Sequence, residues 1–124
     1  MGLIYILGFK FTILLKLFSY RKKVIDNNLK NAFPDKDKSS LRNIKHQFYL
    51  YFGQLLAESV KLFHCSSDTI RKRHKFVNDS QVNAFLKQNK DVLIVLGHYG
   101  NWEWALLASS LNFDAEMVGI YKPL

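Results

Sequence analysis

The chain opens with a long apolar stretch in which polar positions keep to one side. Residues 3–18 are almost all Leu, Ile, Phe or Tyr, interrupted by Lys10 and Lys16. On a helical projection of 100° per residue, Gly8, Thr12, Lys16, Ser19 and Lys23 fall in one narrow stripe, and only Lys10 lies elsewhere. This pattern predicts a helix with an apolar surface and a thin polar line.

The length and flanks of this stretch favour association with a membrane. The run is a little short of the roughly 20 apolar residues that a spanning helix needs, which suits a helix lying in the membrane interface or a poor span. Arg21, Lys22 and Lys23 follow directly, where anionic head groups on the cytoplasmic side would attract them. The charges come after the apolar run, which is unlike a secretory signal peptide. We therefore expect residues 1–20 to form an apolar membrane-associating helix. A buried helix of a globular domain is the alternative.

The middle of the chain predicts further helices. Pro34 and the polar residues 35–40 indicate a turn, with Ser39 or Ser40 as the N-cap of a long helix that reaches about Phe63. Its apolar spacing predicts one buried face, made of Leu41, Ile44, Phe48, Phe52, Leu55, Leu56, Ser59 and Phe63. Residues 65–68 are expected to cap a short basic helix over 69–76, and residues 80–89 to form one more amphipathic helix.

The last third of the chain switches to a strand-like pattern. Residues 91–97 (DVLIVLG) are a continuous apolar run rich in β-branched residues, as in a buried parallel strand. A helical pattern capped by Asn101 follows, and residues 115–121 (AEMVGIY) predict a second strand. The predicted fold class is α/β: a helical N-terminal region followed by a βαβ unit of an incomplete, mainly parallel sheet.

Charge and cysteine content narrow the classes of partner. The net charge of +8 favours anionic partners, such as nucleic acid, acidic lipid or an acidic protein. No zinc-finger, RNP or GXXG motif supports a nucleic-acid partner. The densest basic cluster is Arg71, Lys72, Arg73 and Lys75. Cys65 is the only cysteine, which excludes an internal disulfide and a CxxC zinc site.

The candidate chemistry lies in residues 97–104, GHYGNWEW. His98 would stand at the carboxyl end of the first predicted strand, where open α/β sheets bind ligands, and Glu103 in the first turn of the next helix. A carboxylate can orient an imidazole, which can then take a proton from a hydroxyl. Because no Ser, Thr or Cys stands nearby, that hydroxyl would belong to the substrate. The spacing alone is weak, since His74 and Asp79 share it without a strand or glycines.

The stretch LGHYGNWEW, with RKKVIDNNLKNAFPDKD upstream and YKPL downstream, resembles the bacterial lipid A biosynthesis acyltransferases. These are the lauroyl/myristoyl transferases of the lysophospholipid acyltransferase superfamily, and the resemblance runs from Arg21 to Leu124. It implies transfer of a fatty acyl chain from acyl carrier protein to a hydroxyl of a lipid A precursor, at the cytoplasmic face of the cell inner membrane. It also implies that His98 is the general base and Glu103 its orienting carboxylate, with no metal and no cofactor.

The resemblance gives the surrounding residues candidate roles. Substrate-binding candidates are Gly97, Tyr99, Gly100, Asn101, Trp102 and Lys122. Candidates for contact with the membrane or the carrier are Arg21, Lys22, Lys23, Arg71, Lys72, Arg73 and Lys75. The implied partners are acyl carrier protein as acyl donor, a lipid A precursor or another lipid acceptor, and an anionic membrane surface; nucleic acid is not implied.

The resemblance also sets the expected domain organisation. Family members continue with further strands, helices and an arginine-containing acceptor block, so we expect residues 21–124 to be the N-terminal part of an acyltransferase domain, truncated after the second predicted strand. Two alternatives stay open: a catalytically inactive membrane-binding remnant, and an acyltransferase for another acceptor, such as an ornithine lipid or a mannosylated inositol lipid. A metal-dependent hydrolase is disfavoured because one His and one Glu are too few zinc ligands.

Overall fold

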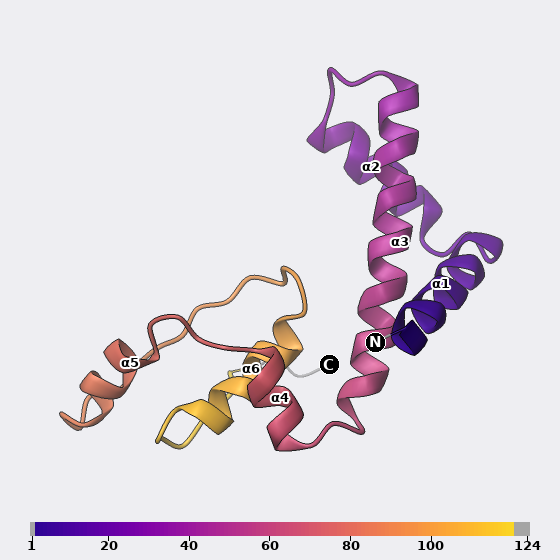
Figure 1. Cartoon of the computed structure of the whole chain (residues 1–124). Helices are drawn as coiled ribbons and strands as arrows, with labels where there is room; N and C mark the ends of the chain where they lie inside the picture. The colour runs from indigo at the N-terminus through magenta and orange to yellow at the C-terminus, as the bar shows by residue number, and fades with distance from the viewer. Residues whose placement is uncertain (1, 121–124) are drawn as a thin grey trace. The chain divides into compact units, whose positions relative to one another are not determined.

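The computed structural model describes residues 2–120, which divide between Phe63 and His64 into two compact units (Figure 1). The first unit contains α1 (Gly2–Leu17), α2 (Lys22–Ala32) and α3 (Lys38–Leu62). The second contains α4 (Ser67–Arg73), α5 (Asp79–Leu86) and α6 (Trp102–Asn112). Helices thus occupy all five regions in which the sequence pattern predicts them, and α2 is an addition.

Small residues bring α1 and α3 into close contact. Gly8 and Thr12 on α1, and Gly53 and Ala57 on α3, are buried. The Thr12 hydroxyl lies 3.0 Å from Gly8 O and 3.1 Å from Tyr49 O, so its proton links the two helices. A Cβ at position 53 would overlap Thr12 Oγ1 and Gly8 O. The helix axes can therefore approach only because position 53 is a glycine.

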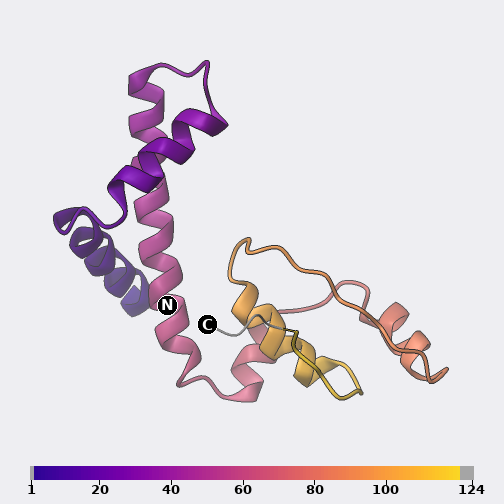
Figure 2. The same ribbon diagram turned by 180° about the vertical axis from the view of Figure 1, so that it is seen from behind.

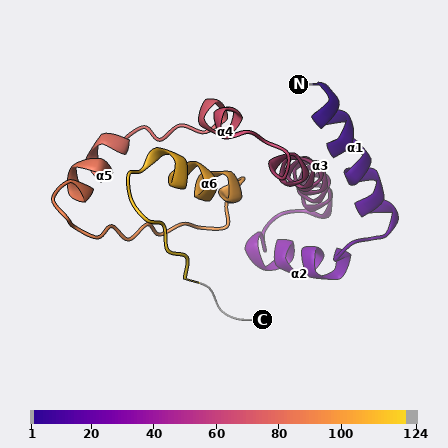
Figure 3. The same cartoon turned by 90° about the horizontal axis from the view of Figure 1, so that it is seen from below.

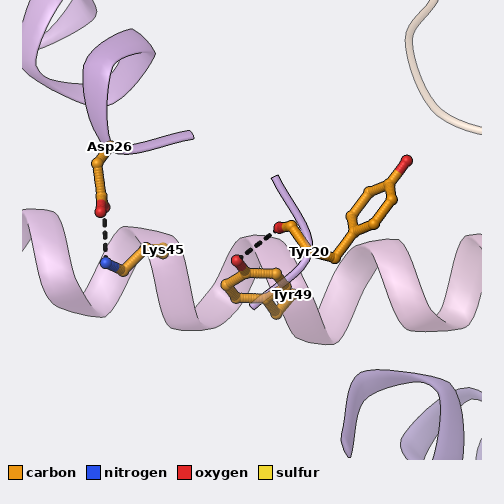
Figure 4. A network of polar contacts seen from close by, with 4 residues as sticks. All are labelled: Tyr20, Asp26, Lys45 and Tyr49. Atoms are coloured by element: carbon orange, nitrogen blue, oxygen red, sulfur yellow. Dashed lines mark hydrogen bonds and ion pairs between the residues drawn. The ribbon is translucent and has the colours of Figure 1, made fainter. Parts of the chain in front are cut away.

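The short helix α2 and the turn before it are each held against α3 by one polar contact (Figure 4). Lys45 Nζ donates to Asp26 Oδ1 at 2.6 Å, and Tyr49 Oη donates to the carbonyl of Tyr20 at 2.9 Å. Ile25 adds one buried apolar side chain. In the view nearly along α3, α1 and α2 lie on neighbouring sides of it (Figure 3). The chain turns between them through left-handed backbone at Ser19 and Arg21, with φ of 49° and 48°.

The side of α1 that does not contact α3 is apolar and exposed. Leu3 is 82% exposed, Leu17 73% and Phe18 76%, and Ile6, Phe9, Ile13 and Leu14 are exposed as well. Among the described residues no single helix is long and apolar enough to cross a membrane. Helices α1 and α2 satisfy that test only as a pair, and the chain bends by 94° between them.

The long helix α3 differs from its prediction at its cap and on its buried face. Its N-cap is Asp37, whose carboxylate accepts from Ser40 N at 2.6 Å, and not Ser39 or Ser40. Its buried residues are Tyr49, Gly53 and Ala57, whereas Phe63 is 87% exposed and Phe48 38%. The predicted buried face is wrong because it was assigned from the spacing of large apolar residues. In the structure, α1 packs against small residues of α3, among them Gly53.

In the second unit, α4 packs against α6. Ile70 of α4 and Trp104, Ala108 and Phe113 in or next to α6 are buried. The ring of Phe76, which follows α4, lies 4.9 Å from the ring of Phe113 between centroids. Ser66 caps α4 by accepting from Thr69 N at 3.3 Å, which confirms the capping predicted for residues 65–68.

The predicted α/β fold class is wrong for the described residues, all of whose regular elements are helices. Residues 91–97 and 115–120 carry no strand, and Figure 2 shows the segment between α5 and α6 as an extended connection. Leu93 is 78% exposed, Val95 83% and Val118 81%. A strand requires ladder hydrogen bonds to a neighbouring strand, and β-branched composition does not supply that neighbour. The predicted βαβ unit and parallel sheet are therefore not present here.

Candidate functional site

His98 lies at the apex of a tight turn just before α6. Tyr99 N donates to Gly97 O at 2.8 Å, which closes a three-residue turn around His98. Gly100 follows with φ of 64°, a left-handed conformation that glycine adopts without strain. The His98 side chain is exposed. The two glycines thus shape a loop in which the imidazole of His98 is exposed to solvent.

The ring of Trp102 fixes one side of that imidazole. The centroids of the His98 and Trp102 rings are 4.8 Å apart, and the ring planes meet at 62°, an edge-to-face contact. Trp102 is the first residue of α6 and is half-buried. The contact restricts the rotation of the imidazole while leaving it open to solvent.

Glu103 lies in the first turn of α6, as the sequence predicted. The partial positive charge at a helix N-terminus favours an ionised carboxylate there. Asn101 occupies the N-cap position, as predicted, but without a side-chain capping hydrogen bond. The carbonyl of Asn101 accepts from Trp104 N at 3.1 Å. The helix start therefore places a carboxylate five residues after the imidazole.

The remaining predicted site residues divide into two groups. Gly97, Tyr99, Gly100 and Asn101 belong to the same loop as His98, and Tyr99 is 92% exposed. Lys122 and the rest of the YKPL segment lie outside the described residues. The basic residues are exposed in both clusters, Arg21–Lys23 at the start of α2 and Arg71–Lys75 at the end of α4, apart from the half-buried His74.

Arg73 and Trp104 form a contact that the sequence reasoning missed. The Arg73 guanidinium lies 5.9 Å from the centre of the Trp104 ring, a cation–π distance. Trp104 is 6% exposed and directly follows Glu103. The contact joins the basic end of α4 to the first turn of α6. The doubled tryptophan in WEW was the only local signal that could have indicated it.

The described residues offer no obvious metal centre. No three His, Cys, Asp or Glu side chains gather there in a way that could hold an ion. A shallow hollow between α5 and the end of α6 is lined by Asn83, Leu86, Lys87, Leu111, Asn112, Phe113 and Asp114. None of the GHYGNWEW residues lines that hollow. The candidate chemistry thus stays with the loop of His98 and the start of α6.

A family model described as bacterial lipid A biosynthesis acyltransferase matches residues 3–124. The chain belongs to this family. Comparisons with curated proteins and with solved structures find no match. The resemblance expected from LGHYGNWEW is therefore confirmed at the level of the family. Membership makes this a chain of the lipid A acyltransferase type, a family that transfers an acyl group from a donor to a lipid acceptor.

Proposed function

We propose that this chain acts in the transfer of a fatty acyl group from acyl carrier protein to a hydroxyl of a lipid A precursor. His98 is the general base, and Glu103 orients it and stabilises the imidazolium. The observation that carries this proposal is the loop of His98. The imidazole lies against the Trp102 ring, with centroids 4.8 Å apart, and Glu103 follows in the first turn of α6. The loop stands in a chain that matches the family.

The proposed reaction is a direct displacement on the carrier thioester. An imidazole nitrogen of His98 accepts the proton of the acceptor hydroxyl while the oxygen attacks the thioester carbon. The new C–O bond forms, the tetrahedral intermediate collapses and the C–S bond breaks. The leaving thiolate then takes the proton from the imidazolium. No side chain of the protein is acylated, which agrees with a GHYGNWEW loop that has no Ser, Thr or Cys.

The proposed location is the cytoplasmic face of the inner membrane. The exposed apolar side of α1 would enter the lipid, since Leu3, Phe9 and Leu17 are 82%, 57% and 73% exposed. Arg21, Lys22 and Lys23 follow α1 and are exposed, and anionic head groups would attract them. The acceptor, itself an amphipathic lipid, would then be present in the same surface.

The His98→Ala variant tests the catalytic assignment. We expect the rate of acyl transfer to fall by about 10²–10⁴-fold, because general-base catalysis contributes that much, while the far-UV circular dichroism spectrum stays unchanged. Glu103→Gln should lower the rate as well, with little change in KM. His64→Ala is the matched control, since His64 is also exposed and lies at the end of α3. Retained activity in His98→Ala would remove His98 from the mechanism.

A further inference from the structure

The two basic clusters of the chain differ in what lies beside them. Arg21–Lys23 follow the exposed apolar residues Leu17 and Phe18, which are 73% and 76% exposed. Around Arg71–Lys75 the apolar neighbours are turned inward: Ile70 is 7% exposed, and the Phe76 ring contacts Phe113. Of the apolar residues between 70 and 77, only Val77 is exposed, at 93%. The first cluster combines charge with apolar surface, and the second presents mainly charge.

The second cluster concentrates the positive charge of its unit. Residues 64–120 contain six Lys and Arg and six Asp and Glu, and four of the six cations lie within residues 71–75. Outside this short segment the unit has two lysines, Lys87 and Lys90, against six carboxylates. Arg71, Lys72 and Lys75 are exposed. Such a local patch attracts a carboxylate-rich partner and guides its approach.

The patch is also tied to the candidate site. Arg73 stacks on Trp104 at 5.9 Å, and Trp104 directly follows Glu103 in α6. The neighbouring His74 ring packs edge-on against Phe76, with centroids 5.1 Å apart, and the Phe76 ring in turn lies 4.9 Å from that of Phe113, directly after α6. These contacts hold the end of α4 against α6, so a partner bound to the patch would stand at a fixed position relative to the start of α6.

We propose that Arg71, Lys72 and Lys75 form the docking surface for an acidic protein, the carrier that delivers the acyl thioester; this rests on the function proposed above. A bilayer surface suits the patch less well, because docking on lipid normally combines cations with exposed apolar side chains, as the α1 region does. The guanidinium of Arg73 serves a different purpose, since it joins the patch to α6.

Direct binding of acyl carrier protein tests this surface without requiring turnover. Fluorescence anisotropy would follow labelled, acylated carrier binding to the full chain in zwitterionic micelles at low salt. Arg71→Glu/Lys72→Glu/Lys75→Glu should weaken binding by about tenfold or more, because reversed charges repel an acidic partner. Arg73 is left unchanged to keep the contact with Trp104. Raising the salt should weaken binding of the unmodified chain.

The matched control is Arg21→Glu/Lys22→Glu/Lys23→Glu, which changes the net charge by the same amount. This control should bind carrier normally but lose binding to phosphatidylglycerol vesicles, and the α4 variant should do the opposite. Carrier binding unaffected by the α4 variant, or vesicle binding lost in its place, would overturn the proposal, as would no carrier binding by the unmodified chain. Carrier binding without acyl transfer would instead refute the proposed function and leave the docking surface standing.

Discussion

At the scale of single residues, the candidate chemistry depends on how one imidazole is presented. His98 sits at a tight turn closed by the 2.8 Å hydrogen bond from Tyr99 N to Gly97 O, with left-handed Gly100 next to it. The motif itself could be read from the sequence, and so could the place of Glu103 in a first helical turn. The contact with Trp102 could not, because it depends on the direction the chain takes between Gly100 and α6.

The first prediction concerns Trp102 as a positioning residue. Trp102→Leu should lower kcat of acyl transfer several-fold with little change in KM, because the imidazole loses the ring that restricts it. Trp102→Phe should retain most of the rate, since an aromatic edge-to-face contact can still form. In NMR spectra the ring-proton resonances of His98 should lose the ring-current shift of the indole in Trp102→Leu. Unchanged resonances would mean that the two rings are not in contact in solution.

At the scale of elements, the first unit depends on capping and close packing that the hydrophobic pattern did not predict. The pattern located α1 and α3 but did not predict α2, whose sequence KKVIDNNLKNA is largely polar. It also assigned α3 a buried face of large residues, whereas Gly53 and Ala57 make the contact with α1. The spacing of apolar residues draws attention to large side chains. Two helices can approach closely, however, where a glycine has no side chain between them.

The second prediction concerns Gly53. In an exposed helix, Gly→Ala would stabilise by about 0.5–1 kcal/mol, but here the Cβ would overlap the backbone carbonyl of Gly8 and the Thr12 side chain. Overpacking of this kind costs about 1–3 kcal/mol, so Gly53→Ala should be destabilising. Gly8→Ala should be much milder, because the overlap there is with the movable Gln54 side chain. Urea unfolding followed by circular dichroism measures both, and equal stabilities would refute this packing.

The third prediction concerns the cap of α3. The hydrogen bond from Ser40 N, followed by that from the Ser39 side chain, lowers the pKa of Asp37 from its ordinary value of 3.8. A carboxyl whose pKa is lowered on folding stabilises the folded state above its ordinary pKa, and loses that contribution as the pH falls through the lowered pKa. The first turn of α3 should therefore fray in acid, below about pH 4.

Amide exchange at Ser40, followed by NMR from pH 6 to pH 2, would detect this fraying as lost protection. In Asp37→Asn the amide oxygen can still accept the hydrogen bond but does not titrate in this range, so the loss with pH should disappear. Asp37→Ala should lack protection at every pH. Protection at Ser40 that is independent of pH in the unmodified chain would show that Asp37 does not cap α3 in solution.

At the scale of the whole molecule, the sequence predicted the family better than the fold. Local signals located five of the six helices in the described residues, all but α2, since capping and periodicity act within a few residues. The prediction of two strands failed because a strand forms only beside another strand. Among the described residues, segments 91–97 and 115–120 have no neighbouring strand with which to pair. Family membership depended on a short motif and its flanks, whose chemistry is readable without the fold around it.

The fourth prediction concerns membrane attachment. Phe9→Asp/Ile13→Asp places two charges on the exposed apolar side of α1 and should abolish flotation with phosphatidylglycerol vesicles, because charged side chains do not enter lipid readily. Asp substitutions at Gln47 and Gln81, which are also exposed, provide a control with the same added charge. Flotation of the α1 variant at the level of the unmodified chain would show that α1 does not enter the lipid.

The mass of the acceptor after incubation with the unmodified chain tests the proposed acyl transfer directly. The chain, in vesicles, is mixed with acyl carrier protein bearing a defined acyl group and with a lipid A precursor. We expect an acceptor heavier by one acyl group, with the protein still at its unmodified mass of 14.5 kDa. An acceptor of unchanged mass would contradict the proposed transfer, and an acylated protein would contradict direct displacement.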